Sequence, residues 1–171
     1  PKVWKYKDSY SMILGSKFKQ EGNDKFTGEA LFYTSKDGEK WTYKNRCYDD
    51  TIGDMWECPD LFEVDGRYVL VMSPENIISD DINYTNNSVY SIVDFDEETC
   101  EMKLINDQKF LDEGLDLYAP QTTLDEFGNR VLIGWMRMPL TFDGEDWIGM
   151  MSLPRVINIK NNDVYFSAPE Y

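Results

Sequence analysis

A single carboxylate stands out within residues 56–62, which read WECPDLF. Glu57 lies between Trp56 and Cys58, two residues before Pro59 and shortly before an apolar, strand-like pair, Leu61 and Phe62. A carboxyl group in such surroundings is partly desolvated, and desolvation favours its neutral form. A carboxyl that keeps its proton near pH 6 can act as a general acid, as glycoside hydrolysis requires. We therefore expect Glu57 to donate a proton, although this segment alone also fits a solvated glutamate at the start of a strand.

The chain of 171 residues contains no histidine, and this excludes several kinds of site. Ser-His-Asp and Cys-His nucleophile systems and His-ligated metal sites all need an imidazole. Any catalysis must therefore depend on carboxylates. Cys47, Cys58 and Cys100 are odd in number and lack the spacing of metal ligands. We expect reduced thiols in a cytoplasmic protein, with no disulfide framework, no metal and no cofactor.

The composition restricts the partners. A net charge of −15 argues against nucleic acid or an anionic membrane surface, because both need basic patches. Aromatic residues make up 15% of the chain, which excludes disorder. Such richness suits stacking on carbohydrate, and packed β-sheet explains it equally well.

Three segments repeat one pattern, in which a proline begins a strand, a turn-forming cluster follows, and a second strand comes next. The repeat prolines are Pro1, Pro59 and Pro120, which are 58 and 61 residues apart. The pattern predicts hairpins over residues 1–14, 59–72 and 120–135.

Further strand-like runs follow each hairpin, and no segment shows a sustained helical stripe of apolar residues. These runs are 30–34 and 41–43, then 89–93 and 101–105, then 148–153 and 156–159, with a last run at 163–166. Four strands at a fixed interval are typical of propeller blades. The sequence thus predicts an all-β fold with three four-stranded antiparallel blades.

Three blades are fewer than the four to eight that close a propeller. We therefore expect a partial propeller whose open blade edges could allow self-association. In a propeller the first strand of each blade lines the central channel. Glu57 and Tyr118 both lie two residues before a repeat proline. Their side chains should therefore face the same cavity.

These motifs resemble glycoside hydrolase family 32, which contains invertases, sucrose-6-phosphate hydrolases and fructan hydrolases. Residues 56–62 resemble the acid/base motif of that family, and residues 1–4 (PKVW) resemble the sequel to its Arg-Asp-Pro motif. Residues 112–121 (DEGLDLYAPQ) are similar to its Asp-x-Gly-x-Asp-Phe-Tyr-Ala-Pro-Gln stretch. Residues 132–136 (LIGWM) and 153–155 (LPR) match two later landmarks, all in family order.

The resemblance implies a five-bladed propeller followed by a β-sandwich, and a retaining mechanism with an Asp nucleophile. Glu57 would be the acid/base of a parent enzyme that hydrolyses β-fructofuranosidic bonds of sucrose, sucrose 6-phosphate or fructan. The chain begins with Pro1 and lacks an Asn-Asp-Pro-Asn-type nucleophile motif. We therefore expect residues 1–171 to be a fragment of the catalytic propeller, without its first blade or blades and without the sandwich, and to be inactive alone.

The resemblance also suggests substrate-binding residues. Asp116, and less strongly Asp112, would hydrogen-bond sugar hydroxyls, with a solvated loop acid as the alternative. Trp135 would stack on a sugar face, and its alternative is a core aromatic.

Tyr118 could reach the Glu57 carboxyl, or could only pack between blades. Cys58 occupies the repeat position of the missing Asp and would fill space against the channel. At residue 117 the chain has leucine where the family often has phenylalanine. Phosphate recognition needs a cation at the rim, for which Arg137 and Lys2 are candidates.

Two other functions remain open at this point. A sister family of arabinan- and xylan-degrading furanosidases has the same propeller, although the ECPDLF motif disfavours it. The chain could also be a non-catalytic carbohydrate-binding or assembly module.

Overall fold

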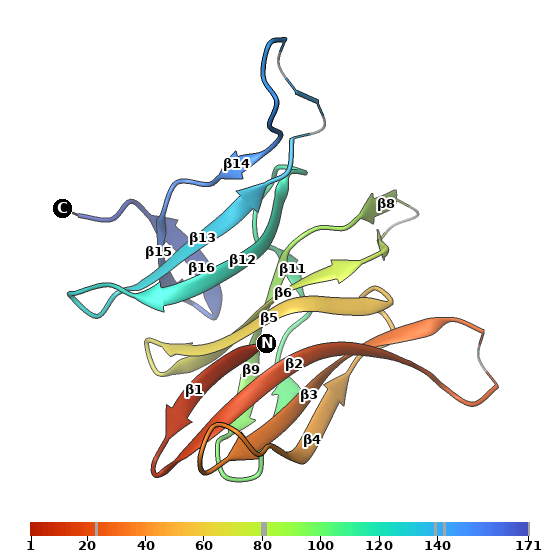
Figure 1. The fold of residues 1–171 in the computed structure, drawn as a ribbon, viewed down its shortest axis with the longest axis vertical. Coiled ribbons are helices and arrows are strands. Elements are labelled where there is room, and N and C mark those ends of the chain that lie inside the picture. Colours follow the sequence, from red (N-terminus) through yellow and green to blue (C-terminus); the bar gives the residue numbers. More distant parts are fainter. Residues whose placement is uncertain (23, 80–81, 139, 142, 171) are drawn as a thin grey trace.

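The computed structural model describes residues 1–22, 24–79, 82–138, 140–141 and 143–170, with only the backbone of residues 79 and 82–85. All secondary-structure elements in these ranges are strands, and most belong to three antiparallel sheets that follow one another along the chain (Figure 1). We call these sheets blades A, B and C.

Each blade is a meander of four main strands. Blade A contains β1 (Lys2–Tyr6), β2 (Ser9–Lys19), β3 (Phe26–Ser35) and β4 (Thr42–Tyr48). Blade B contains β5 (Met55–Val64), β6 (Arg67–Glu75), β9 (Val89–Asp96) and β10 (Glu101–Leu104), with the short β11 (Lys109–Phe110) paired to β9. Blade C contains β12 (Leu117–Leu124), β13 (Arg130–Met136), β15 (Arg155–Lys160) and β16 (Asp163–Ser167), with the short β14 (Met150–Met151) paired to β13.

Blade B is buried on both faces, and the sequence of β6 explains how. Successive side chains of a strand point to opposite faces of its sheet. Leu70 and Met72 therefore join the core cluster shared with blade A, while Val69 and Val71 join the cluster shared with blade C. All four side chains are fully buried. A continuous apolar run is what a strand needs when both of its faces are covered.

Trp56 fixes the start of β5 against blade A. Its indole is fully buried, and its Nε1–H donates a hydrogen bond of 2.8 Å to the carbonyl oxygen of Ile52. Two glycines of blade A make room for it. A Cβ at Gly28 would lie 2.3 Å from the indole, and a Cβ at Gly15 would lie 1.7 Å from the Trp56 carbonyl oxygen. The sequence therefore positions the residue that follows, Glu57, through a close approach that only glycine permits.

The predicted hairpins and the three-blade meander are confirmed, and two details differ. Residues 148–153 were expected to form the third strand of blade C, but only β14 pairs there, and β15 is the third strand. The side chains of Met150, Met151 and Leu153 are exposed, so this apolar run lacks the packing partner that would extend it. A separate hairpin of β7 (Ile77–Ser79) and β8 (Ile82–Thr85), which no pattern predicted, follows β6.

Among the described residues, no helix is long and apolar enough to cross a membrane.

Candidate active site

Two equivalent β-bulges shape the start of the inner strands of blades B and C. The pairing of β5 with β6 shifts register between Glu57 and Asp60, and the pairing of β12 with β13 shifts between Tyr118 and Gln121. The residue before the repeat proline adopts a positive φ in both blades, 48° at Cys58 and 50° at Ala119. A bulge re-aims neighbouring side chains and often lies beside a functional site.

Glu57 and Tyr118 meet across the boundary between blades B and C. The Tyr118 hydroxyl donates a hydrogen bond of 2.5 Å to Oε2 of Glu57, and it lies 3.2 Å from the carbonyl oxygen of Ser73. Tyr118 is buried, whereas Glu57 is half-buried and open on one side. The repeat phase therefore placed correctly two residues that are 61 positions apart.

The environment of Tyr118 keeps its hydroxyl protonated. Burial raises the pKa of Tyr118 well above its usual range, and the hydrogen bond to Glu57 and the negative charge of that carboxylate raise it further. Tyr118 is therefore a permanent donor at neutral pH. It can orient one oxygen of Glu57 and leave the other free for a substrate.

A pair of serines holds β12 in place beside Glu57. Ser73 is the cross-strand partner of Glu57, and its Oγ accepts a hydrogen bond of 2.9 Å from the Ala119 amide. The Oγ atoms of Ser73 and Ser88 lie 3.0 Å apart, and Ser88 Oγ donates to the carbonyl oxygen of Leu117 at 3.1 Å. Sequence reasoning missed both serines. The available signal was two hydroxyls in segments where buried apolar residues would be expected.

Asp60 ties together the inner strands of all three blades. It is fully buried, and its Oδ2 accepts hydrogen bonds from Lys2 Nζ of β1 at 3.0 Å and from the Thr122 amide of β12 at 2.6 Å. Lys2 Nζ also donates to the Thr122 carbonyl oxygen at 2.6 Å. Lys2, a sequence candidate for phosphate binding, is thus engaged in this contact. Asp60 escaped the sequence analysis because its partners, Lys2 and Thr122, come from two distant segments.

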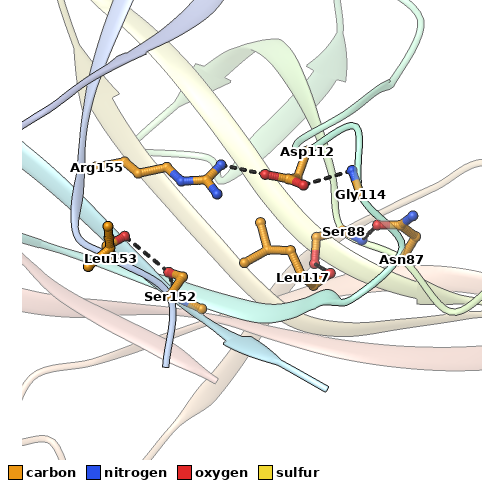
Figure 2. Close-up of polar contacts among 9 residues, drawn as sticks. Asn87, Ser88, Asp112, Gly114, Leu117, Ser152, Leu153 and Arg155 are labelled. Atoms are coloured by element: carbon orange, nitrogen blue, oxygen red, sulfur yellow. Dashed lines mark hydrogen bonds and ion pairs between the residues drawn. The ribbon is translucent and has the colours of Figure 1, made fainter. Parts of the chain in front are cut away.

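Asp112 is also engaged, as Figure 2 shows. Its Oδ2 accepts a hydrogen bond of 2.6 Å from Arg155, which reaches across from β15, and its Oδ1 accepts one of 2.8 Å from the Gly114 amide. Burial alone would raise the pKa of Asp112, but the bonds from Arg155 and Gly114 and the charge of Arg155 lower it overall. The carboxylate therefore organises its loop, and its role in sugar binding stays a prediction.

The remaining predicted residues surround the pair of Glu57 and Tyr118. Trp135 lies opposite Tyr118 in the ladder of β12 and β13 and is 41% exposed, so its ring is available for stacking. Asp116 is half-buried, and its carbonyl oxygen accepts a 2.9 Å hydrogen bond from the Arg137 amide. Cys58 is exposed on the bulge, and its place against the channel stays a prediction.

The described residues contain no cluster of acidic and cysteine side chains that could hold a metal ion. What the site offers is one open carboxylate, a tyrosine that orients it, and an exposed indole. This arrangement suits proton transfer to a bound polyol.

Comparison with known proteins identifies the family of the chain. Residues 1–169 match the model of the glycosyl hydrolases family 32 N-terminal domain. The sucrose-6-phosphate hydrolase of Vibrio alginolyticus is 39% identical, over 94% of this chain and 34% of that protein. The Bacillus subtilis sucrose-6-phosphate hydrolase is 32% identical, over 93% of this chain and 35% of that protein. The chain thus spans about a third of the length of these curated relatives.

Solved structures agree with the sequence matches. A Bombyx mori GH32 beta-fructofuranosidase, solved as a mutant in complex with sucrose, superposes with a TM-score of 0.84 and 32% identity. This match covers 99% of the chain and 37% of the insect protein. The predicted propeller fold is thereby confirmed, and the arabinan- and xylan-type alternative is not favoured.

Proposed function

Because the chain belongs to glycosyl hydrolase family 32, we propose that it is the part of a retaining β-fructofuranosidase that carries the acid/base residue, Glu57. The observation that supports this role is the hydrogen bond from Tyr118, which holds Glu57 at the boundary between two blades with one side open. The substrate of the longer enzyme would be sucrose or sucrose 6-phosphate. Relatives named for these activities support that choice.

Each residue has a defined task in the proposed reaction. Glu57 gives its proton to the leaving-group oxygen as the glycosidic bond breaks, and it later takes a proton from the attacking water. Retention requires a second carboxylate about 5–5.5 Å away as nucleophile. The family resemblance implies an Asp in an Asn-Asp-Pro-Asn-type motif, which these 171 residues do not contain. We therefore propose that the chain is a fragment of the propeller domain.

The neighbouring residues would bind the sugar. Trp135 would stack on one sugar face through its exposed ring, and Asp116 would accept hydrogen bonds from hydroxyl groups. Asp112 would contribute by holding the loop before β12. We also propose a cytoplasmic location, which the three unpaired thiols of Cys47, Cys58 and Cys100 support.

The test is Glu57→Gln in the full-length enzyme. This change removes the transferable proton and nearly preserves the size of the side chain, so kcat for sucrose or sucrose 6-phosphate should fall by about 10²–10⁴-fold. Glu63→Gln is a matched control, because Glu63 is an exposed glutamate on the same strand. The control should keep its rate within about twofold, as surface substitutions usually do. A Glu57→Gln enzyme with the normal rate would rule out the proposed role.

A further inference from the structure

Arg137 is a cation in direct contact with the proposed acid/base pair. Its guanidinium carbon lies 4.9 Å from the centre of the Tyr118 ring, and the Tyr118 hydroxyl binds Glu57. Its amide bonds to the Asp116 carbonyl oxygen, so its backbone is joined to the loop that carries a predicted sugar ligand. Arg137 follows directly after β13, two residues beyond Trp135.

The guanidinium is held by neutral groups alone. Its Nη2 donates hydrogen bonds to the carbonyl oxygens of Asn86 at 2.7 Å and Leu115 at 2.8 Å. A guanidinium has five N–H donors. The two bonds account for two of them, and within the described ranges no carboxylate forms an ion pair with Arg137. The orientation is thus fixed while three donors and the full positive charge remain available.

Two other cations near the inner strands are already paired with carboxylates. Lys2 pairs with Asp60, and Arg155 pairs with Asp112. In a chain with a net charge of −15, an approaching anion would be repelled unless a local cation attracted it. A planar, pre-oriented guanidinium is the side chain best suited to bind phosphate through two parallel hydrogen bonds.

We propose that Arg137 binds the phosphate group when sucrose 6-phosphate is the substrate, and that this contact sets the preference for the phosphorylated disaccharide over sucrose. This inference rests on the proposed function. Tyr118 connects the proposed phosphate-binding residue with the proposed proton donor. Its hydroxyl binds Glu57, and the Arg137 guanidinium lies against its ring. The phosphate would therefore be held while Glu57 protonates the bond to be broken.

The experiment compares kcat/KM for sucrose 6-phosphate and for sucrose in the full-length enzyme. Arg137→Gln should lower the ratio of the two values by about 30-fold, within the range expected for losing hydrogen bonds to a charged group. Arg137→Lys keeps a point charge without the planar fork and should restore part of the ratio. Arg67→Gln removes one exposed positive charge on β6 and should change the ratio by less than about twofold. Inhibition by inorganic phosphate should weaken in Arg137→Gln and stay unchanged in Arg67→Gln.

Two results would overturn this assignment while leaving the proposed function intact. One is a wild-type enzyme that hydrolyses sucrose at least as well as sucrose 6-phosphate. The other is an equal loss on both substrates in Arg137→Gln, which would show that Arg137 only supports Tyr118 and the adjoining loops. A wild-type enzyme that hydrolyses neither substrate would instead overturn the proposed function, and this assignment with it.

Discussion

At the scale of single residues, the contact between Tyr118 and Glu57 has the clearest consequence. A buried phenol donates to one oxygen of a half-open carboxylate, so the carboxylate can turn only in a limited way. Pre-orientation of a catalytic group lowers the barrier by avoiding reorganisation during the reaction. In the proposed reaction, Tyr118 would thus be a positioning residue for Glu57.

Tyr118→Phe in the full-length enzyme removes the hydroxyl and keeps the ring that packs between blades B and C. We expect kcat/KM to fall by about 10-fold, which corresponds to one net hydrogen bond of about 1.4 kcal/mol. Tyr165→Phe is the matched control, because Tyr165 is an exposed tyrosine in β16. Equal activity in the two variants would contradict the positioning role.

The same residue predicts a feature of the pH profile. Because burial and Glu57 raise the pKa of Tyr118, its hydroxyl keeps its proton as the pH rises through the ordinary tyrosine value of about 10. Any loss of activity in alkaline solution below that pH must come from another group. The alkaline limb should therefore appear in both wild type and Tyr118→Phe. A limb that vanished in the variant would show that Tyr118 ionises within this range.

At the scale of strands, Asp60 joins the three blades where their inner strands begin. The Lys2 ammonium of β1 donates hydrogen bonds to the Asp60 carboxylate of β5 and to the Thr122 carbonyl oxygen of β12. The Thr122 amide donates a third bond to the same Asp60 carboxylate. Glu57 lies three residues before Asp60, and Tyr118 lies four before Thr122. The contact therefore sets the spacing between the strands that carry the proposed site.

Asp60→Asn should destabilise the chain by about 3 kcal/mol, because it breaks a buried pair and leaves the Lys2 ammonium without its counter-charge. The double variant Lys2→Met with Asp60→Asn should lose less free energy of unfolding than the sum of the losses in the two single variants, because each single change already breaks the ion pair. Urea unfolding curves of the four proteins would measure this coupling. Asp8→Asn, in the exposed turn between β1 and β2, should change stability by less than about 0.5 kcal/mol. Additive losses of unfolding free energy in the double variant would show that Lys2 and Asp60 do not stabilise the chain through their interaction with each other.

The order of the strands could be predicted from the sequence where hairpins repeat. The prediction was wrong where the pairing of a strand depends on its neighbours in space. The repeat prolines, the turn-forming clusters and the apolar run of β6 identified the inner hairpins without any knowledge of packing. The apolar run at 148–153 carries the same local signal, yet only β14 pairs there. Periodicity cannot show whether a facing strand exists. The pair of Ser73 with Ser88 was hidden for the same reason, because its members lie in one blade and are not equivalent positions of the repeat. Lys2 and Asp60 do occupy equivalent positions, directly after a repeat proline, but the repeat does not show that their side chains pair across blades A and B.

At the scale of the whole molecule, blade C presents an apolar surface. Trp147, Ile148, Met150, Met151 and Leu153 are all exposed in or next to β14. An exposed patch of this kind favours association, and unpaired strand edges add to it. We expect the 171-residue chain to form oligomers as its concentration rises, with sedimentation velocity as the measurement.

Leu153→Lys should shift this equilibrium towards monomer, since it places a charge where an apolar side chain is 84% exposed. Phe127→Lys is the matched control, because Phe127 is an exposed aromatic in the turn between β12 and β13, at the opposite end of β13 from β14, and should not affect association. A wild-type chain that stays monomeric at high concentration would refute the expectation.

The last prediction concerns what three blades can do alone. A retaining reaction needs a second carboxylate about 5–5.5 Å from the first. Asp60 is the acid nearest to Glu57 along β5, but it is fully buried and bound to Lys2 and Thr122, so it cannot attack a sugar. We therefore expect the 171-residue chain to release no fructose from sucrose or sucrose 6-phosphate. The assay would compare the wild-type chain with its Glu57→Gln variant as a blank. Turnover by the wild-type chain that the blank lacks would mean that a nucleophile lies within these three blades.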